Sequence, residues 1–195
     1  MQKFKDYDTT RSYSDARQLP KGGYVLRIMN AEEKENSNGK YIQISCDIAE
    51  GDFKDFFMED WKSQNREDKK WHCNYLLTEP KDDGSEKDGW TKRRFKTVTE
   101  ALEESNANYH WDWDETKWKN KLIGGLFNER QYRGSDGQLR MATNLAQLCS
   151  VEKIRSGNFK LPKDKLLDNA APLAPTPADA DGFMPIPTAD DVPWA

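Results

Sequence analysis

Alternating apolar and polar residues mark a strand near the start of the chain. In Tyr41-Ile-Gln-Ile-Ser-Cys-Asp-Ile48 every second residue from Ile42 onward is apolar, which is the period of a half-buried β-strand. The run at residues 24–31 is also dense in β-forming residues. Asn38-Gly39 lies between the two runs and favours the positive φ angles of a tight turn. The sequence therefore predicts an antiparallel hairpin.

Later segments predict three more strands and one helix. Residues 53–58 read as a third strand, and residues 88–102 place Phe95, Val98, Ala101 and Leu102 at helical spacing, with Asp88 or Thr91 as the cap. Residues 122–132 and 139–154 flank Gly134-Ser-Asp-Gly137, a second hairpin signal. Gly124-Gly125 suits a sharp bend in a strand of a small barrel.

This order of elements predicts a mainly β fold. Five strands in hairpins, with one helix between the third and fourth strands, is the layout of an OB-fold, a five-stranded Greek-key barrel that binds oligonucleotides. We expect an N-terminal arm at residues 1–19, an OB-like nucleic-acid-binding domain at residues 20–167, and a disordered acidic tail at residues 168–195. The tail is rich in Ala and Pro and has no Lys or Arg, a composition that does not offset the entropy of folding.

Charge and composition narrow the functional classes. The formal charge is −4, and the tail holds five aspartates with nothing to offset them. The body is therefore close to neutral, and any nucleic-acid site must be a local patch. Three widely spaced cysteines argue for a reducing compartment. The charged start and the lack of a long apolar run predict a cytoplasmic protein with no membrane contact.

Aromatic residues lie among cations at three places, as single-stranded nucleic acid requires, because cations hold phosphates and aromatic faces stack on bases. Seven Trp, seven Tyr and eight Phe are more than one core of this size needs, so some of them should be exposed. The first place is the expected helix start, the second is the last hairpin and the third is the outer side of the first hairpin. The candidate residues are, in that order, Trp90, Lys92, Arg93 and Arg94; Arg130, Tyr132, Arg133 and Arg140; and Arg27, Lys40 and Tyr41.

At the helix start, cations oppose the helix dipole unless an anion joins them, and a phosphate would suit both the cations and the unpaired N–H groups. The alternatives are a solvated helix face for the first place, an exposed turn made soluble by arginine for the second, and rim tyrosines packed on a neighbouring loop for the third. For the remaining tryptophans, packing is the main expectation, with one or two on the path of the nucleic acid.

The C-terminal tip carries a second signal. Two carboxylates, Asp190 and Asp191, directly precede an apolar plug formed by Val192, Pro193 and Trp194. An acidic tip with a hydrophobic plug on a Pro/Ala tether resembles the C-terminus of bacterial and phage single-stranded DNA-binding proteins, which ends in Pro-Phe. Here Trp194 takes the aromatic position and Ala195 follows it. The alternative is a frayed acidic terminus.

The body also resembles a phage protein family. Lys121-Leu-Ile-Gly-Gly-Leu-Phe-Asn-Glu-Arg-Gln-Tyr132 and Val151-Glu-Lys-Ile-Arg-Ser-Gly-Asn-Phe-Lys-Leu-Pro162 look like the closing hairpin of phage and prophage proteins found among replication and recombination genes and thought to bind single-stranded DNA. The resemblance covers roughly residues 20–165. It implies sequence-independent binding of single-stranded DNA in the cytoplasm of a bacterial host, with a tip that recruits replication or recombination proteins. Homo-oligomerisation stays open.

Two other functions remain as alternatives. One is a phage adaptor or host-defence inhibitor that acts through protein contacts alone. The other is a metal-dependent nuclease built on Asp112, Asp114 and Glu115. His72-Cys73 has no second ligand pair at zinc spacing, and there is no Gly-rich phosphate loop. We therefore expect a protein that is not an enzyme and that has no metal or cofactor.

Overall fold

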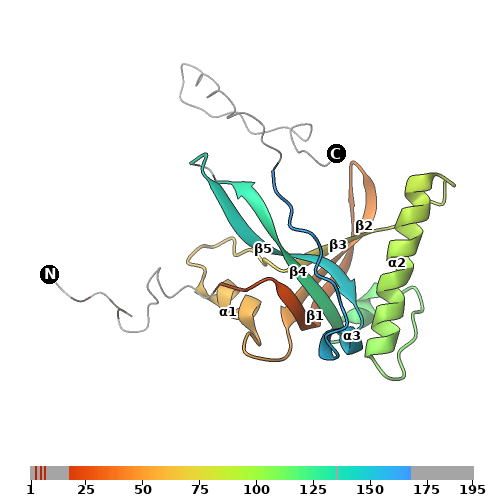
Figure 1. Cartoon of the computed structure of the whole chain (residues 1–195), viewed down its shortest axis with the longest axis horizontal. Helices are drawn as coiled ribbons and strands as arrows, with labels where there is room; N and C mark the ends of the chain where they lie inside the picture. The colour runs from red at the N-terminus through yellow and green to blue at the C-terminus, as the bar shows by residue number, and fades with distance from the viewer. Residues whose placement is uncertain (1–2, 4, 6, 8–17, 135, 168–195) are drawn as a thin grey trace, which may run out of the picture.

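The computed structural model describes residues 3, 5, 7, 18–134 and 136–167 of the chain. One antiparallel sheet dominates it, with the strand order β3-β2-β1-β4-β5 (Figure 1). The strands are β1 (Gly22–Asn36), β2 (Gly39–Ile48), β3 (Asn74–Thr78), β4 (Leu122–Arg133) and β5 (Leu139–Cys149). The helices of the described part are α1 (Phe56–Ser63), α2 (Glu86–Ser105), the 3₁₀ helix η2 (Glu115–Trp118) and α3 (Val151–Arg155). The prediction of a mainly β fold is confirmed.

The first hairpin forms as the alternation predicts. Ile42, Ile44, Cys46 and Ile48 are all buried, and β2 pairs with β1 around a turn in which Gly39 has a φ of 120°. The register shifts between Ile28 and Asn30, which bends β1 and raises its local twist. Long strands that bend in this way can wrap around a core.

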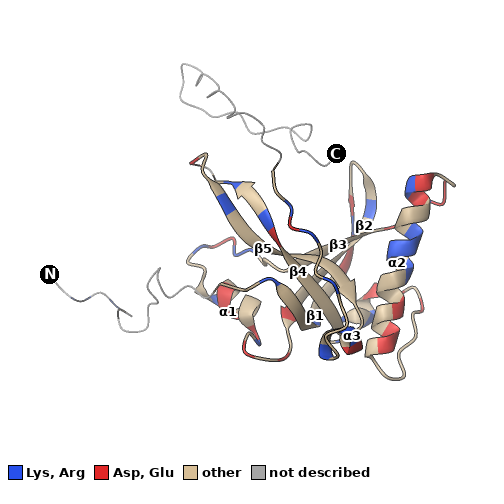
Figure 2. Cartoon of the chain, viewed as in Figure 1, with Lys and Arg blue, Asp and Glu red and all other residues tan. Residues whose placement is uncertain are grey.

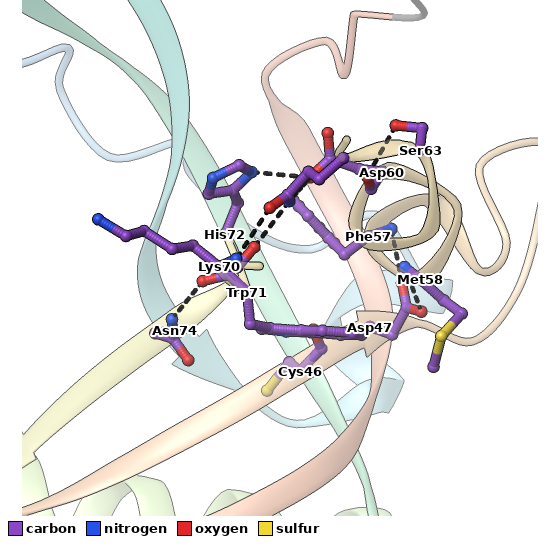
Figure 3. A network of polar contacts seen from close by, with 11 residues as sticks. Cys46, Asp47, Phe57, Met58, Asp60, Ser63, Lys70, Trp71, His72 and Asn74 are labelled. Carbon is purple, nitrogen blue, oxygen red and sulfur yellow. Dashed lines mark hydrogen bonds and ion pairs between the residues drawn. The ribbon is translucent and has the colours of Figure 1, made fainter. Parts of the chain in front are cut away.

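The expected third strand at residues 53–58 is wrong, because this segment leads into α1. The buried carboxylate of Asp47 explains the difference: its two oxygens accept the backbone N–H groups of Phe57 (3.0 Å) and Met58 (3.1 Å) (Figure 3). These are N–H groups of a helix start, which lack partners within the helix. Phe57 then packs into the core from the helix. The actual third strand is β3, which pairs with β2 from Ser45↔Asn74 to Tyr41↔Thr78.

A network of polar contacts returns the chain from α1 to β3 (Figure 3). The Gln64 side chain bonds both the carbonyl and the N–H group of Lys70, each at 2.8 Å. The indole of Trp71 donates to the Cys46 carbonyl (2.9 Å), and Asn74 donates to the Trp71 carbonyl (2.7 Å). Residues without a clear hydrophobic period are thus held by side-chain contacts to the backbone.

The long helix α2 begins earlier than the sequence predicted. Its cap is Ser85, whose side chain accepts from the N–H group of Asp88 (3.1 Å), and not Asp88 or Thr91. Asp88 lies in the first turn, where its buried carboxylate accepts the N–H groups of Lys81 (2.9 Å) and Asp82 (3.1 Å). The first turn of α2 therefore carries a buried carboxylate that binds the loop before the helix.

The last hairpin, β4 and β5, follows α2 and η2. Gly125 sits where a Cβ atom would lie 2.4 Å from Leu26 Cδ1 and 2.9 Å from Leu145 Cδ1, so only glycine allows β4 to approach β1 so closely. The register shifts at Leu126/Phe127, next to the glycines. The predicted strand at residues 139–154 ends at Cys149, and α3 follows. The last described segment then lies beside β4, where Lys165 bridges Arg130 in parallel.

Barrel closure is absent from the described residues, because β3 and β5 are the two edge strands of the sheet and do not pair. α2 packs beside both edges (Figure 1). Its apolar residues Phe95, Val98 and Leu102 join the core, together with the fully buried Trp118 of η2. In the described ranges, no helix has the length and apolar character needed to cross a bilayer. The expected tail and most of the expected arm lie outside the described residues.

Candidate nucleic-acid interface

Lys92, Arg93 and Arg94 lie near the middle of α2, between the acidic residues of its first turn and those toward its C-terminal end (Figure 2). Since the helix begins at Glu86, Lys92, Arg93 and Arg94 lie beyond the first turn, where the effect of the helix dipole has faded. The expectation that they surround the helix start is wrong. Their surroundings differ from one another and have to be judged one by one.

Lys92 is held by two carboxylates. Its Nζ atom is 2.9 Å from Asp88 Oδ2 and also bonds Asp82. Both contacts raise the pKa of Lys92, and the contact to Asp82 has the larger effect. Lys92 therefore fastens the loop before α2 to the helix, and a phosphate would have to displace two carboxylates to reach it.

Arg93 and Trp90 form an exposed cation and aromatic pair. The guanidinium carbon of Arg93 is 5.5 Å from the centre of the Trp90 ring, within the range of a cation–π contact. Trp90 is 64% exposed, so most of its surface faces solvent. This pair offers a stacking surface and a positive charge at one place.

Arg94 lies against the edge strand β3. Its Nε atom donates to the Tyr75 hydroxyl (2.8 Å), and its guanidinium carbon is 4.8 Å from the centre of the Tyr75 ring. A second nitrogen is 3.4 Å from the Leu76 carbonyl oxygen. Three contacts fix this side chain, and none of them is to a carboxylate.

A pocket of about 290 Å³ opens beside Arg94, between the two edge strands. Its lining comes from β3, α2 and β5: Tyr75, Arg94, Thr97, Val98, Ala146, Gln147 and Leu148. The pocket lies where the sheet stays open, and Arg94, Thr97 and Gln147 give it polar groups.

The last hairpin has two different faces. Arg130 pairs with Ala142 and Tyr132 with Arg140, while Gln131 pairs with Met141 and Arg133 with Leu139. Because side chains alternate across a strand, Arg130, Tyr132 and Arg140 share one face and Arg133 lies on the other. Arg140 forms an ion pair with Asp136 (2.5 Å), and Arg133 donates to the Gly137 carbonyl (2.8 Å). The structure thus brings together three of the four predicted residues of this hairpin.

The candidates of the first hairpin do not form one group. Tyr41 and Lys40 are neighbours in β2 and point to opposite faces; Lys40 pairs with Glu33 (2.7 Å). Arg27 lies at the far end of β1, opposite Asp47, and bonds Asp55 (3.0 Å). By register Arg27 and Tyr41 share the outer side but lie at opposite ends of the hairpin, and Lys40 points to the other side, so the three do not form one site.

Residues that the sequence analysis missed share the face of Tyr41. Lys34 pairs directly with Tyr41 in the register, and Gln43 pairs with Leu76, which is exposed. Lys34 Nζ donates to Gln43 Oε1 (3.2 Å). The sequence held a signal for them: the alternation in β2 and the register of the hairpin together predict which residues of the partner strand share the face of Tyr41.

Trp113 is an exposed aromatic on the other flank of α2. It is 80% exposed, and its ring stacks on Phe95 at 6.3 Å between centres. Trp113 has a φ of 66°, an unusual backbone conformation for a bulky residue. Its neighbours Asp112 and Asp114 both pair with Lys117, and the described residues hold no group of three or more acidic, His or Cys side chains placed for a metal ion.

Comparison with known proteins assigns no family. No family model matches the chain. A protein named tyrosinase from Streptomyces lincolnensis is 29% identical over 130 residues, which span 64% of this chain and 40% of that protein. The matched part is therefore well under half of that protein's length, and the function of this chain rests on its own geometry.

Proposed function

We propose that this protein binds single-stranded DNA without sequence preference and recruits partner enzymes through its C-terminal tip. Its setting would be phage replication or recombination in the cytoplasm of a bacterial host. No metal, cofactor or catalytic residue is needed for this role. The proposal rests on the body for DNA binding and on the tip, outside the described residues, for recruitment.

The strand order supports an OB-type barrel that stays partly open. In the order β3-β2-β1-β4-β5 the two edge strands are the ones that would have to pair to close the barrel. The long helix α2 comes between β3 and β4 in the chain. OB-folds bind oligonucleotides on the face of their second and third strands and with the loops of their two hairpins. Here these are the face of Tyr41 and the two hairpin ends.

The observation that carries the proposal is the pair of neighbouring cations Arg93 and Arg94 on α2, next to the exposed ring of Trp90. Arg93 lies 5.5 Å from the centre of the Trp90 ring. Arg94 lies 4.8 Å from the ring centre of Tyr75, which is buried and holds the guanidinium in place. Arg93 and Arg94 are exposed, and neither forms an ion pair with a carboxylate of the described residues. A positive groove with aromatic faces holds a single strand whatever its bases.

The hairpins would extend this path at both ends. The cationic face of the last hairpin, which we define as Arg130, Tyr132 and Arg140, is supplemented by Lys165 beside Arg130. The Arg140 ion pair is exposed, and such pairs contribute little to stability, so a phosphate can replace Asp136. Lys34 and Tyr41 would contact the strand at the first hairpin. Lys92, held by two carboxylates, is left out of the path.

Fluorescence anisotropy with labelled dT oligonucleotides and a matched duplex tests the proposal. Binding should be tighter to the single strand and should weaken steeply with salt, because counterions are released from the contacted phosphates. Equal affinity for duplex and single strand would overturn the proposal. Absence of binding would favour the protein-contact alternative, and Mg²⁺-dependent cleavage of the label would favour the nuclease.

Recruitment by the tip is tested separately. Trp194→Ala should abolish pulldown of replication or recombination enzymes, because a buried aromatic supplies much of the energy of a small interface. The same variant should bind dT oligonucleotides as the unmodified chain does. If it loses DNA affinity instead, Trp194 stacks on bases and the recruitment role is wrong.

A further inference from the structure

The edge strand β3 pairs with β2 alone in the sheet. Hydrogen bonds at the two ends of this pairing show which of its backbone groups face β2. The N–H group of Cys46 donates to the Cys73 carbonyl (2.9 Å), and the N–H group of Glu79 donates to the Lys40 carbonyl (3.0 Å). In an antiparallel pair, residues that bond the partner strand alternate with residues that do not. The odd-numbered residues of β3 therefore bond β2, and the even-numbered residues point their backbone groups to the open edge.

Leu76 and Thr78 are two of these even-numbered residues. Leu76 is 50% exposed, and Thr78 is exposed as well. Among the described residues, no acceptor bonds the backbone N–H group of either one. The Leu76 carbonyl, in contrast, accepts a guanidinium nitrogen of Arg94 (3.4 Å). This edge thus keeps two unused donors, while the acceptor between them is taken.

Arg94 places a positive charge beside these donors. Its guanidinium is fixed by the Tyr75 ring (4.8 Å to the ring centre), by the Tyr75 hydroxyl (2.8 Å) and by the Leu76 carbonyl. Its neighbour Arg93 adds a second exposed cation that forms no ion pair with a carboxylate of the described residues. Backbone N–H groups next to a cation form a site for an anion.

The open edge has room for a ligand. A pocket of about 290 Å³ lies between the two edge strands, with Tyr75 and Arg94 on one side and Ala146 and Gln147 of β5 on the other. Edges of sheets are normally paired or covered. Here β5 leaves the edge of β3 uncovered, so that a ligand can approach its N–H groups.

The unequal use of donors and acceptors indicates the kind of ligand. An added peptide strand would need the carbonyl groups of the edge as well as its N–H groups, and the central carbonyl is occupied by Arg94. The oxygens of a phosphodiester only accept hydrogen bonds, and backbone N–H groups are frequent partners of nucleic-acid phosphates. A phosphate therefore suits the two donors and the cation together.

We propose that the open edge of β3 binds one phosphate group of single-stranded DNA, through the N–H groups of Leu76 and Thr78 and the guanidinium of Arg94. This assignment rests on the proposed binding of single-stranded DNA and adds the place at which the backbone of the strand is held. Trp90 lies one helical turn before Arg94 on the same face of α2. A base adjoining the bound phosphate would stack on its exposed ring.

NMR spectra of the isotope-labelled full chain, titrated with a dT oligonucleotide, test the site directly. The amide signals of Leu76 and Thr78 should shift on binding, and their hydrogen exchange should slow, because solvent-exposed N–H groups gain an acceptor. The amide of Leu77 faces β2 and is the internal control, which should change far less.

Thr78→Pro removes one of the two N–H groups and leaves the charge of the chain unaltered. Proline is tolerated in an edge strand where its nitrogen faces away from the partner strand. In the anisotropy experiment this variant should bind the dT oligonucleotide at least about tenfold more weakly, the loss expected for one hydrogen bond to a charged group.

Met141→Pro in the other edge strand is the matched control. The N–H group of Gly134 donates to the Gln138 carbonyl (2.8 Å), so by the same alternation Met141 directs its N–H group away from β4. This variant also places a proline at an open edge, but away from Arg93 and Arg94, and should bind dT as the unmodified chain does. Circular dichroism verifies that both variants are folded.

Each outcome decides the matter. If dT binds but the amides of Leu76 and Thr78 do not respond, or if the two proline variants bind equally, the assignment is wrong and the DNA-binding proposal stands. If Thr78→Pro lowers capture of partner enzymes at unchanged dT affinity, the edge pairs with a strand of a partner protein instead. If dT does not bind at all, the DNA-binding proposal fails and this site fails with it. Should Thr78→Pro not fold, the amide signals of the unmodified chain decide.

Discussion

The guanidinium of Arg94 lies over the ring of Tyr75 at 4.8 Å and bonds its hydroxyl at 2.8 Å. The two residues belong to different elements, α2 and β3, so this contact ties the helix to the open edge of the sheet. It also holds a cation at the mouth of the pocket between the edge strands. A cation fixed by a ring and a hydroxyl keeps its charge available for a phosphate.

Arg94→Ala should weaken binding of dT oligonucleotides and lower the slope of log K against log salt by about 0.7, the loss expected for one phosphate contact on a single strand. Tyr75→Phe is the matched control, because it keeps the ring under Arg94 and removes only the hydroxyl. Its slope should stay unchanged. A salt titration followed by anisotropy measures both, and an unaltered slope for Arg94→Ala would remove Arg94 from the path.

Trp90→Ala should cost about 1–3 kcal/mol of binding free energy, the value of one stacked base, without loss of fold, because the side chain is largely exposed. Trp61→Ala is the control: Trp61 is 37% exposed and lies under Lys69 Nζ at 4.9 Å, and it belongs to α1 and not to α2. Anisotropy with a dT oligonucleotide should show a loss for Trp90 alone. Comparable losses for both variants would mean that the stacking site is not on α2.

Asp47 should make stability fall as pH rises. Burial raises the pKa of Asp47 in the folded chain, and the bonds from Phe57, Ile48 and Met58 only partly oppose this. The folded state then binds more protons than the unfolded state between the ordinary aspartate pKa, about 3.9, and the raised value. In that window the Asp47 contribution declines with rising pH.

Asp47→Asn tests this by urea unfolding at a series of pH values. The variant should lack the decline in that window and should be less stable throughout by about 1–3 kcal/mol, because the amide cannot accept all three N–H groups. Identical pH profiles for the two proteins would contradict the assignment. Carboxylates with a lowered pKa, such as Asp164 beside Lys21, make stability rise with pH. They do so equally in the variant and in the unmodified chain, so their effect cancels when the two unfolding free energies are subtracted.

Gly125→Ala should destabilise the fold by about 1–3 kcal/mol, the cost of overpacking a core, because the new methyl group would meet Leu26 and Leu145. Gly89→Ala is the counterpart in α2, where nothing lies within 4 Å of the added Cβ atom. That change should stabilise by roughly 0.5–1 kcal/mol, since alanine loses less entropy in a helix. Chemical denaturation measures both; a tolerated alanine at position 125 would mean that β4 can move away from β1.

Sequence reasoning succeeded where the determinants are local. The alternation from Ile42 to Ile48 and the Asn38-Gly39 turn fix β2 and its partner through neighbouring residues alone. The segment at residues 53–58 failed because its phenylalanines suit a strand equally well. Its helical state depends on Asp47, which supplies the bonds for the helix start from another element. Such a contact has no trace in the local pattern.

For the candidate site, too, sequence reasoning found the features that depend on neighbouring residues and missed those that depend on other elements. Trp90, Arg93 and Arg94 were found because cations and aromatic residues adjoin in the chain. The ion pairs of Lys92 depend on where α2 begins, and that was misjudged by missing Ser85 as the cap. The placement of Arg133 on the face opposite Arg130 and Tyr132 was within reach, because side chains alternate along a strand.

The central position of β1 has a consequence for how the chain folds. β1 pairs with β2 across a short turn, but its other edge pairs with β4, where Gly22 meets Phe127 and more than half of the chain lies between the two. Pairings so distant in sequence slow folding, because the entropy of closing the loop is lost before the contacts form. During synthesis the first hairpin emerges well before β4. Until β4 arrives, one edge of β1 has no partner, and this interval is when the nascent chain is most exposed to pairing with a neighbouring chain.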